Sequence, residues 1–165
     1  MAVTQQLVRV SAARLAACRT SVAELHKLCS YRSAPRSDHL DLDWWPVVLR
    51  RLGEPPEHAH LSVLRRAFDG HDEVNPAYRD HPTTVWEHPV TALEPDAVGV
   101  LAAELCGVTP QDVGAAAVLS GRADTGFAGL EPETVTEHVV RAFGVLRDFY
   151  AEAASRRMAV VLWWD

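Results

Sequence analysis

The sequence lacks the features that define membrane proteins, disulfide-rich proteins and zinc proteins. It contains no run of about 18 apolar residues, so we expect no membrane-spanning helix. Its first stretch, MAVTQQLVRV, lacks the basic and then apolar layout of a signal peptide, which favours a cytoplasmic location. Cys18, Cys29 and Cys106 lie far apart without a C-x-x-C pair, which argues against a disulfide framework and against a thiolate zinc site.

Lysine is also scarce, and positive charge is not concentrated anywhere. Lys27 is the single lysine beside 15 arginines, the arginine pairs are scattered, and the net charge is −6. Nucleic acids and anionic membranes are bound by positive fields. We therefore predict that the protein binds neither nucleic acid nor membrane.

Sequence motifs of catalysis are absent as well. The chain has no G-x-S-x-G, no H-E-x-x-H and neither of the standard glycine-rich phosphate loops. No cysteine stands in a recognisable activating context. We predict no cofactor and no metal, and we favour a protein that is not an enzyme.

The stretch from Glu131 to Asp165 carries the clearest structural pattern. Apolar residues recur there every three or four positions, which predicts one face of a long helix opened by Pro132. This apolar stripe consists of Val135, Val139, Ala142, Phe143, Leu146, Phe149, Tyr150 and Ala153. Met158 to Trp164 then runs apolar without a break and predicts a closing strand. Because the helix must bury its stripe, its expected partner is a sheet that contains this strand.

The rest of the chain predicts short strands separated by helices. The expected strands are 4–10, 83–86 and 90–93. The first expected helix covers 12–29 after Ser11, and the second follows Asp43 and stops at Gly53. The later expected helices cover 61–68, a stretch that begins at Pro95, and 110–119 after Thr109. Residues 30–39 are expected to be loop, and residues 71–82 a functional or variable loop. We predict one α+β domain over 1–165, with a small, mainly antiparallel sheet whose N- and C-terminal strands are adjacent. Several helices pack on it, including the long C-terminal one.

Three stretches resemble the YfbM-like family of small bacterial proteins, which is defined as a domain of unknown function. They are LDLDWWPVVLRRL, VTALEPDAVGVLAAEL and AFGVLRDFYAEAASRRMAVVLWWD. The resemblance implies a single α+β domain and no known reaction. Two departures stand out: Trp44-Trp45-Pro46 replaces a lysine and a following aromatic residue, and Phe127-Ala-Gly-Leu130 replaces a Tyr-Pro-x-x-Trp segment.

The densest group of polar and aromatic residues predicts a first candidate site. It consists of Asp38, His39, Asp41, Asp43, Trp44 and Trp45. The carboxylates and the histidine suit metal or acid–base chemistry, and the tryptophans suit a ligand pocket. The competing interpretation is structural: Asp43 caps the next helix, Asp41 caps a turn, and one tryptophan packs in the core.

Histidines in loops form the second group. His58 and His60 make an H-x-H pair without further metal-ligand spacing, so exposed loop histidines are expected there. His81, Trp86 and His88 lie in and beside the second polar stretch and are retained as binding candidates. Trp163 and Trp164 should point to opposite sides of a strand, which makes the outer ring a candidate binding anchor.

Two hypotheses about function follow. The first is a non-enzymatic cytoplasmic protein that docks a protein partner, because the chain is acidic and offers tryptophan anchors; neutralisation of a basic toxin would suit that charge. The alternative is a small-molecule-binding protein or enzyme whose pocket lies between Asp41–Trp45 and His81–His88. A homodimer is compatible with either hypothesis.

Overall fold

The structure, a computed structural model, describes residues 4–82, 88–121 and 132–165. Within them, five strands form one antiparallel sheet in the order β2-β1-β5-β4-β3. The strands are β1 (Gln5–Val10), β2 (His39–Asp41), β3 (Asp72–Glu73), β4 (Thr91–Leu93) and β5 (Ala159–Trp164). β1 and β5 pair from Gln5 opposite Trp164 to Val10 opposite Ala159. The predicted adjacency of the terminal strands is confirmed.

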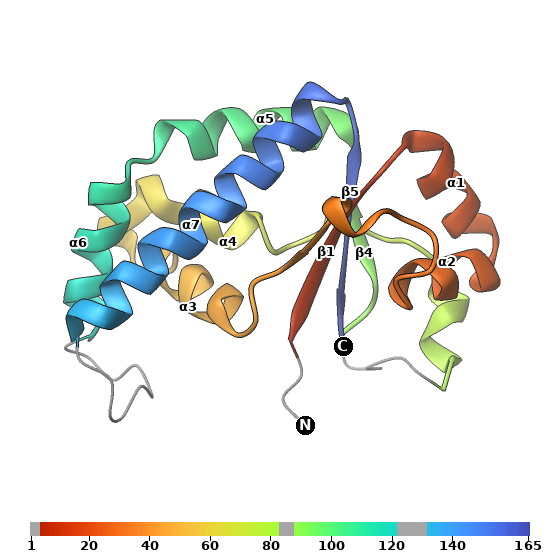
Figure 1. The fold of residues 1–165 in the computed structure, drawn as a ribbon, viewed down its shortest axis with the longest axis horizontal. Helices are drawn as coiled ribbons and strands as arrows, with labels where there is room; N and C mark the ends of the chain where they lie inside the picture. The colour runs from red at the N-terminus through yellow and green to blue at the C-terminus, as the bar shows by residue number, and fades with distance from the viewer. Residues whose placement is uncertain (1–3, 83–87, 122–131) are drawn as a thin grey trace.

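Helices cover both faces of this sheet. Figure 1 shows α1 (Ala12–Thr20) and α2 (Val22–Cys29) on one side and the remaining α-helices on the other. These are α3 (Trp45–Leu52), α4 (Ser62–Arg66), α5 (Pro95–Gly107), α6 (Pro110–Gly121) and α7 (Pro132–Ser155), joined by the 3₁₀ helices η1 (Arg36–Asp38), η2 (Pro56–Leu61) and η3 (Pro76–Asp80). The predicted α+β class, with an antiparallel sheet packed by several helices, is confirmed.

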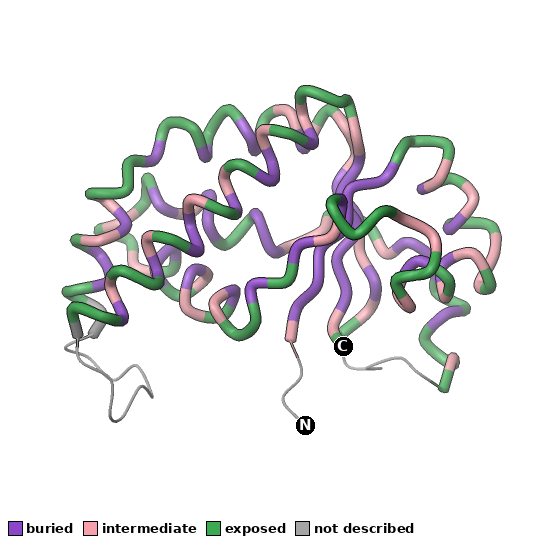
Figure 2. The backbone as a smooth tube through the Cα atoms, in the orientation of Figure 1, coloured by how far each residue is buried: buried purple, intermediate pink, exposed green. Residues whose placement is uncertain are grey.

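The alternation of β5 divides the interior into two cores. Val160 and Leu162 belong to the larger core shared with α3–α7, whereas Val161 and Trp163 belong to the core under α1 and α2. A strand covered on both faces has no polar side, which explains why β5 reads as a continuous apolar run. Figure 2 shows the buried central strands between the two helical layers.

Helix α7 buries the predicted stripe completely. All eight of its residues, from Val135 to Ala153, are buried. The stripe includes Tyr150, whose hydroxyl donates a 2.5 Å hydrogen bond to the Ala67 carbonyl and so keeps its polar atom paired in the core. The predicted capping box before α6 also forms: Thr109 Oγ1 accepts from the Asp112 N–H, and Asp112 Oδ2 accepts from the Thr109 N–H.

The helix predicted over 12–29 is wrong, because the chain forms two helices there. Ser21 is extended, with φ −137° and ψ 115°, and its side chain accepts a hydrogen bond from the Glu24 N–H. A serine oxygen competes with the helical backbone for such donors and favours a new N-terminus. The three- and four-residue apolar spacing continues across the break, so periodicity alone did not reveal it.

Two short strands were missed and one helix start was wrong. The predicted loop 30–39 contains η1 and the first residue of β2, and β3 lies in the predicted loop 71–82. Asp43 does not cap α3: it has a φ of 54°, and its N–H donates to Asp41 Oδ1 over 2.7 Å. The interpretation of Asp41 as a turn cap is therefore confirmed. The predicted helix over 61–68 is shorter, as α4, and the predicted strand 83–86 lies outside the described residues.

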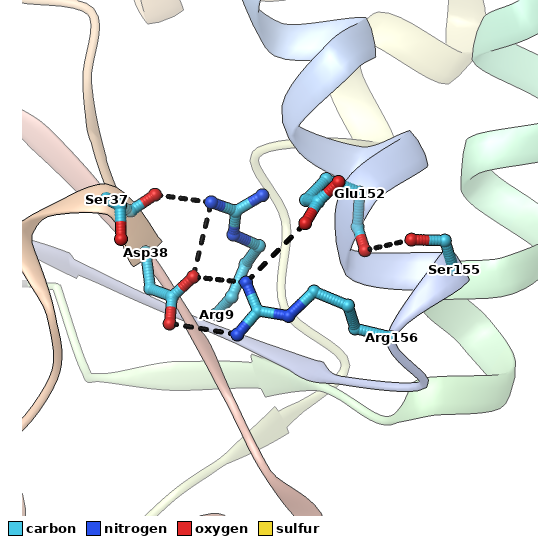
Figure 3. A network of polar contacts seen from close by, with 6 residues as sticks. All are labelled: Arg9, Ser37, Asp38, Glu152, Ser155 and Arg156. Carbon is cyan, nitrogen blue, oxygen red and sulfur yellow. Dashed lines mark hydrogen bonds and ion pairs between the residues drawn. The ribbon is translucent and has the colours of Figure 1, made fainter.

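A buried ion pair ties the first strand to the segment that precedes β2. Arg9 on β1 and Asp38 in η1 are 8% and 3% exposed, with Arg9 Nη2 3.2 Å from Asp38 Oδ1 (Figure 3). Arg9 Nη2 also donates to the Ser37 carbonyl, and its guanidinium lies 4.8 Å from the centroid of the Phe149 ring. Buried charges persist when they are paired and hydrogen-bonded in this way.

Candidate functional site

A partly enclosed pocket lies where the end of β5 meets α2 and the chain around η3. Its volume is about 230 Å³. Five aromatic side chains line it: Tyr31, Tyr78, His88, Trp163 and Trp164. The other described lining residues are Cys29, Ser30, Glu73, Asn75, Arg79, Pro89, Val90 and Asp165. We call this the β5-end pocket.

Each aromatic ring of the pocket is held by another ring. The Tyr31 and Trp163 centroids are 5.7 Å apart with tilted planes, and His88 stacks on Trp164 at 4.7 Å. Tyr78 stacks on His81 at 5.1 Å. Tilted and offset ring pairs at these distances are favourable. The pocket walls are therefore ordered before any ligand arrives.

Polar groups of the pocket are also fixed in place. Arg79 makes a bidentate contact with Glu73, with Nε and Nη2 2.6 and 2.9 Å from the two carboxylate oxygens. The Asn75 side chain accepts from the Ala77 N–H and donates to the Cys18 carbonyl, which anchors the start of η3 to α1. The backbone of Asp165 exchanges two hydrogen bonds with Thr4, at 2.8 and 3.0 Å.

Burial and nearby carboxylates shift two groups in this pocket. Burial raises the pKa of the Tyr31 phenol to about 12, and the negative charges of Asp165 and Asp41 act in the same direction. Burial likewise raises the pKa of the Cys29 thiol to about 12. Both groups are therefore protonated at neutral pH. The phenol can donate a hydrogen bond, and the thiol is a poor nucleophile.

The first predicted group is split between the two ends of β2. His39 lies behind the β5-end pocket, with its ring centroid 5.0 Å from Tyr31 and 6.1 Å from Trp163. Burial lowers the pKa of His39. Asp41 is two residues further along β2 and exposed, and it acts on Tyr31 through its charge. These two residues belong to the surroundings of the pocket, although they are not among its described lining.

The remaining members of that group lie elsewhere. Trp44 stacks on Trp45 with centroids 5.1 Å apart, and Trp45 stacks on His138 of α7 at 5.7 Å. Trp45 packs against the larger core, whereas Trp44 is 42% exposed. Asp43 is exposed in the turn before α3. The predicted pairing of Asp41–Trp45 with His81–His88 around one pocket is therefore corrected: the tryptophans and Asp43 lie outside it.

The second predicted group, the loop histidines, contributes residues to the β5-end pocket itself. His88 lines the β5-end pocket, and His81 lies beside it, 4.2 Å from the His26 ring and stacked on Tyr78. Trp86 lies outside the described residues. Of the terminal tryptophans, Trp163 is 3% exposed, whereas the following Trp164 is half-buried and borders the pocket.

A second, broader pocket adjoins the first across the Trp164–His88 stack. It measures about 520 Å³, shares His88, Pro89 and Trp164 with the β5-end pocket, and is lined on its other side by Gln5, Arg50 and Arg51. Arg50 is already bound to Asp69 at 2.8 Å. The side-chain oxygen of Gln5 has no hydrogen-bond partner, while its amide nitrogen donates to the Phe68 carbonyl.

Metal ligation is not suggested by the described geometry. Among residues 4–82, 88–121 and 132–165, no group of three or more His, Cys, Asp or Glu side chains is placed to hold an ion. His58 and His60 form an edge-to-face pair with centroids 6.3 Å apart. In the same part of the chain, no helix is long and apolar enough to cross a bilayer.

Sequence reasoning missed Tyr31, Asn75, Tyr78 and Asp165. Tyr31 and Tyr78 each stand alone in a polar stretch, and single aromatic residues in loops carry little signal. The prediction that residues 71–82 form a functional loop was the available indication, because Asn75 and Tyr78 come from that stretch.

Comparison with known proteins identifies the fold. No family model matches the sequence, and no curated protein matches it. A protein of unknown function, YfbM from Escherichia coli, has a crystal structure that aligns with 98% of this chain and 99% of that chain, with a TM-score of 0.61 and 10% sequence identity. The resemblance predicted from three stretches of sequence is thus confirmed at the level of structure: this chain has the YfbM-like fold.

Proposed function

We propose that the protein binds a small organic molecule in the β5-end pocket. The observation that carries this proposal is the convergence of five aromatic side chains from distant parts of the chain around one cavity. Binding sites for small molecules are typically concave, largely apolar and aromatic, with a few fixed polar groups. The pocket meets each of these conditions.

The size of the pocket sets the scale of the ligand. A volume of about 230 Å³ lies below the ~300–1,000 Å³ usual for drug-sized ligands. At ~30 Å³ per molecule of liquid water, it has room for roughly eight waters. We therefore expect a compact metabolite rather than a nucleotide or a coenzyme.

Binding is favoured over catalysis by the state of the pocket's nucleophile. Cys29 is the thiol in the described lining, and its pKa of about 12 keeps it protonated. The Glu73 carboxylate is engaged by Arg79. Nucleophilic catalysis by cysteine needs the thiolate, which this pKa disfavours at neutral pH.

The proposal is tested by ligand screening with a site-specific readout. A panel of compounds of about 8 to 15 non-hydrogen atoms, small enough for this cavity, is screened for a rise in melting temperature. Binding to the native state alone must raise that temperature. Hits are then mapped by NMR on the five tryptophan indole N–H signals, and those of Trp163 and Trp164 should shift.

A blocking variant sharpens this test. Ser30 lines the pocket at the end of α2, so Ser30→Trp should fill it and abolish the effect of every hit. Ser155→Trp is the matched control, because Ser155 is exposed at the end of α7. A panel that leaves both the melting temperature and the Trp163 and Trp164 signals unchanged would contradict the proposal.

A second candidate function is the docking of a protein partner, favoured by the exposed start of α3. Trp44 and Val47 are 42% and 40% exposed and lie one helical turn apart. Exposed tryptophans are typical anchors of protein interfaces. With a net charge of −6, a basic partner such as a toxin would be attracted over long range, and the association would weaken with salt.

Crosslinking tests this second candidate. A photoreactive phenylalanine analogue at Trp44 should give an adduct of defined mass in the native cell extract, which diminishes at high salt. The same analogue at Val100, 58% exposed on α5, is the control. A self-crosslink would instead indicate a homodimer, and equal labelling from both positions would contradict a docking role for Trp44.

The proposed location is the cytoplasm. Cys18, Cys29 and Cys106 are all free thiols, as is usual in a reducing compartment. Secreted small domains, by contrast, commonly pair their cysteines. Fractionation of cells that express the tagged protein checks this location directly.

A further inference from the structure

The charge of the β5-end pocket narrows the class of its ligand. Its described lining holds two carboxylates, Glu73 and Asp165, and one guanidinium, Arg79. Arg79 and Glu73 neutralise one another through their bidentate contact. Asp165 is exposed at the pocket and acts on the Tyr31 phenol by its charge and by a side-chain hydrogen bond; in the described part of the chain no cation is paired with it.

The aromatic walls of the pocket also favour a positively charged ligand. The faces of tryptophan and tyrosine rings carry negative electrostatic potential, and they attract cations placed within about 6 Å of the ring centre. Tyr31, Trp163 and Trp164 lie in the same pocket as Asp165. An anion there would be repelled by both the carboxylate and the ring faces, and a neutral ligand would gain no charge pair with Asp165.

The negative charges around the pocket also act on Tyr31. The pKa of Tyr31 is raised to about 12, mainly by burial, and the charges of Asp165 and Asp41 contribute in the same direction. A carboxylate on β2 and another just after β5 therefore project negative potential onto one ring of the pocket.

We propose that the β5-end pocket selects a small organic cation: a protonated amine with an apolar body, its charged end at Asp165 and its body against Trp163 and Trp164. This inference rests on the proposed function of small-molecule binding and adds the charge of the ligand. The ammonium group would donate to the Asp165 carboxylate, and the rings would cover the apolar part.

The experiment compares three probes of nearly equal shape and different charge. These are 2-phenylethylamine, 2-phenylethanol and phenylacetate, titrated into the full chain at pH 7 and followed by the Trp163 and Trp164 indole signals. The amine should bind at least about tenfold more tightly than the alcohol, because it adds a charge pair and a cation–π contact. Phenylacetate should bind most weakly.

Two variants test whether the tighter binding of the amine depends on the Asp165 carboxylate. Asp165→Asn should weaken the amine about tenfold and leave the alcohol unchanged, since it removes only the charge pair. The backbone pairing of Asp165 with Thr4 is unaffected by this change, so the fold is retained. Asp148→Asn, an exposed site on α7, is the matched control and should leave all three affinities as they are.

The outcomes separate this inference from the function on which it rests. If the alcohol or phenylacetate binds as tightly as the amine, the pocket binds small molecules but the selection of cations is wrong. If none of the three compounds perturbs the Trp163 or Trp164 signals, the result contradicts both the selection of cations and the binding of small molecules in this pocket. If the amine binds but Asp165→Asn has no effect, the assignment to Asp165 is overturned.

Discussion

Arg156 and Asp38, 118 positions apart in the sequence, form a two-point ion pair in the folded chain. Arg156 Nη1 donates to Asp38 Oδ1 over 2.6 Å, and Nη2 donates to Oδ2 over 3.2 Å (Figure 3). Asp38 also faces Arg9 of β1, so one buried carboxylate joins the first strand, the segment before β2 and the end of α7. It fixes β2 at the sheet edge, behind the β5-end pocket.

Asp38→Asn should therefore destabilise the protein strongly. Arg9 is 8% exposed, and without the carboxylate its charge would stay buried and uncompensated. Breaking a buried pair in this way costs about 3–5 kcal/mol. Urea unfolding measures the loss, and Asp148→Asn, at an exposed position, should change stability little. Equal effects of the two substitutions would argue against an energetic role for the buried pair.

Arg157→Gly should stabilise the protein. Arg157 follows α7 with a φ of 51°, and the Met158 N–H donates back to the Ala153 carbonyl over 2.9 Å. Glycine adopts this left-handed conformation without the ~1 kcal/mol penalty of other residues. The same substitution at Arg147, inside α7, should instead destabilise by about 1 kcal/mol. Chemical denaturation of both variants checks the opposite signs.

Stability should fall in mild acid because of His39. Burial lowers its pKa in the folded state below the ordinary value of 6.5, so the unfolded chain binds the proton more readily. The contribution of His39 is therefore complete above about pH 6.5 and is lost as the pH falls below it. Melting temperatures between pH 7.5 and 5 should show a smaller decline in His39→Gln than in the wild type. His71→Gln, at an exposed position, should retain the full decline.

Cys29 should react slowly with thiol reagents. Its pKa of about 12 leaves little thiolate at pH 8, whereas Cys106 is exposed on α5. Only the thiolate is alkylated, so iodoacetamide should modify Cys29 at least ~100-fold more slowly than Cys106. Peptide mass spectrometry follows both sites over time. A ligand in the β5-end pocket should slow Cys29 further and leave Cys106 unchanged; rapid labelling of Cys29 would show that its burial is not maintained in solution.

The local elements with strong sequence patterns were predictable. The stripe from Val135 to Ala153 and the apolar run before Asp165 specified α7 and β5, because periodicity reports burial directly. Thr109 and Asp112 specified the start of α6 through hydrogen bonds that close within one helical turn. Each of these signals lies within a few residues of the structure that it determines.

The sequence by itself thus determined the α+β class, the long helix and the central pair of terminal strands. Only the tertiary structure decided the pocket, because Tyr31, Tyr78 and Trp164 come from separate segments and meet only when β5 is paired and α2 is packed. The same holds for β2 and β3, whose two or three residues are strands only because β1 and β4 supply their hydrogen bonds. Short-range propensity sets a helix or a long strand. A site assembled from loops depends on long-range packing that no local pattern encodes.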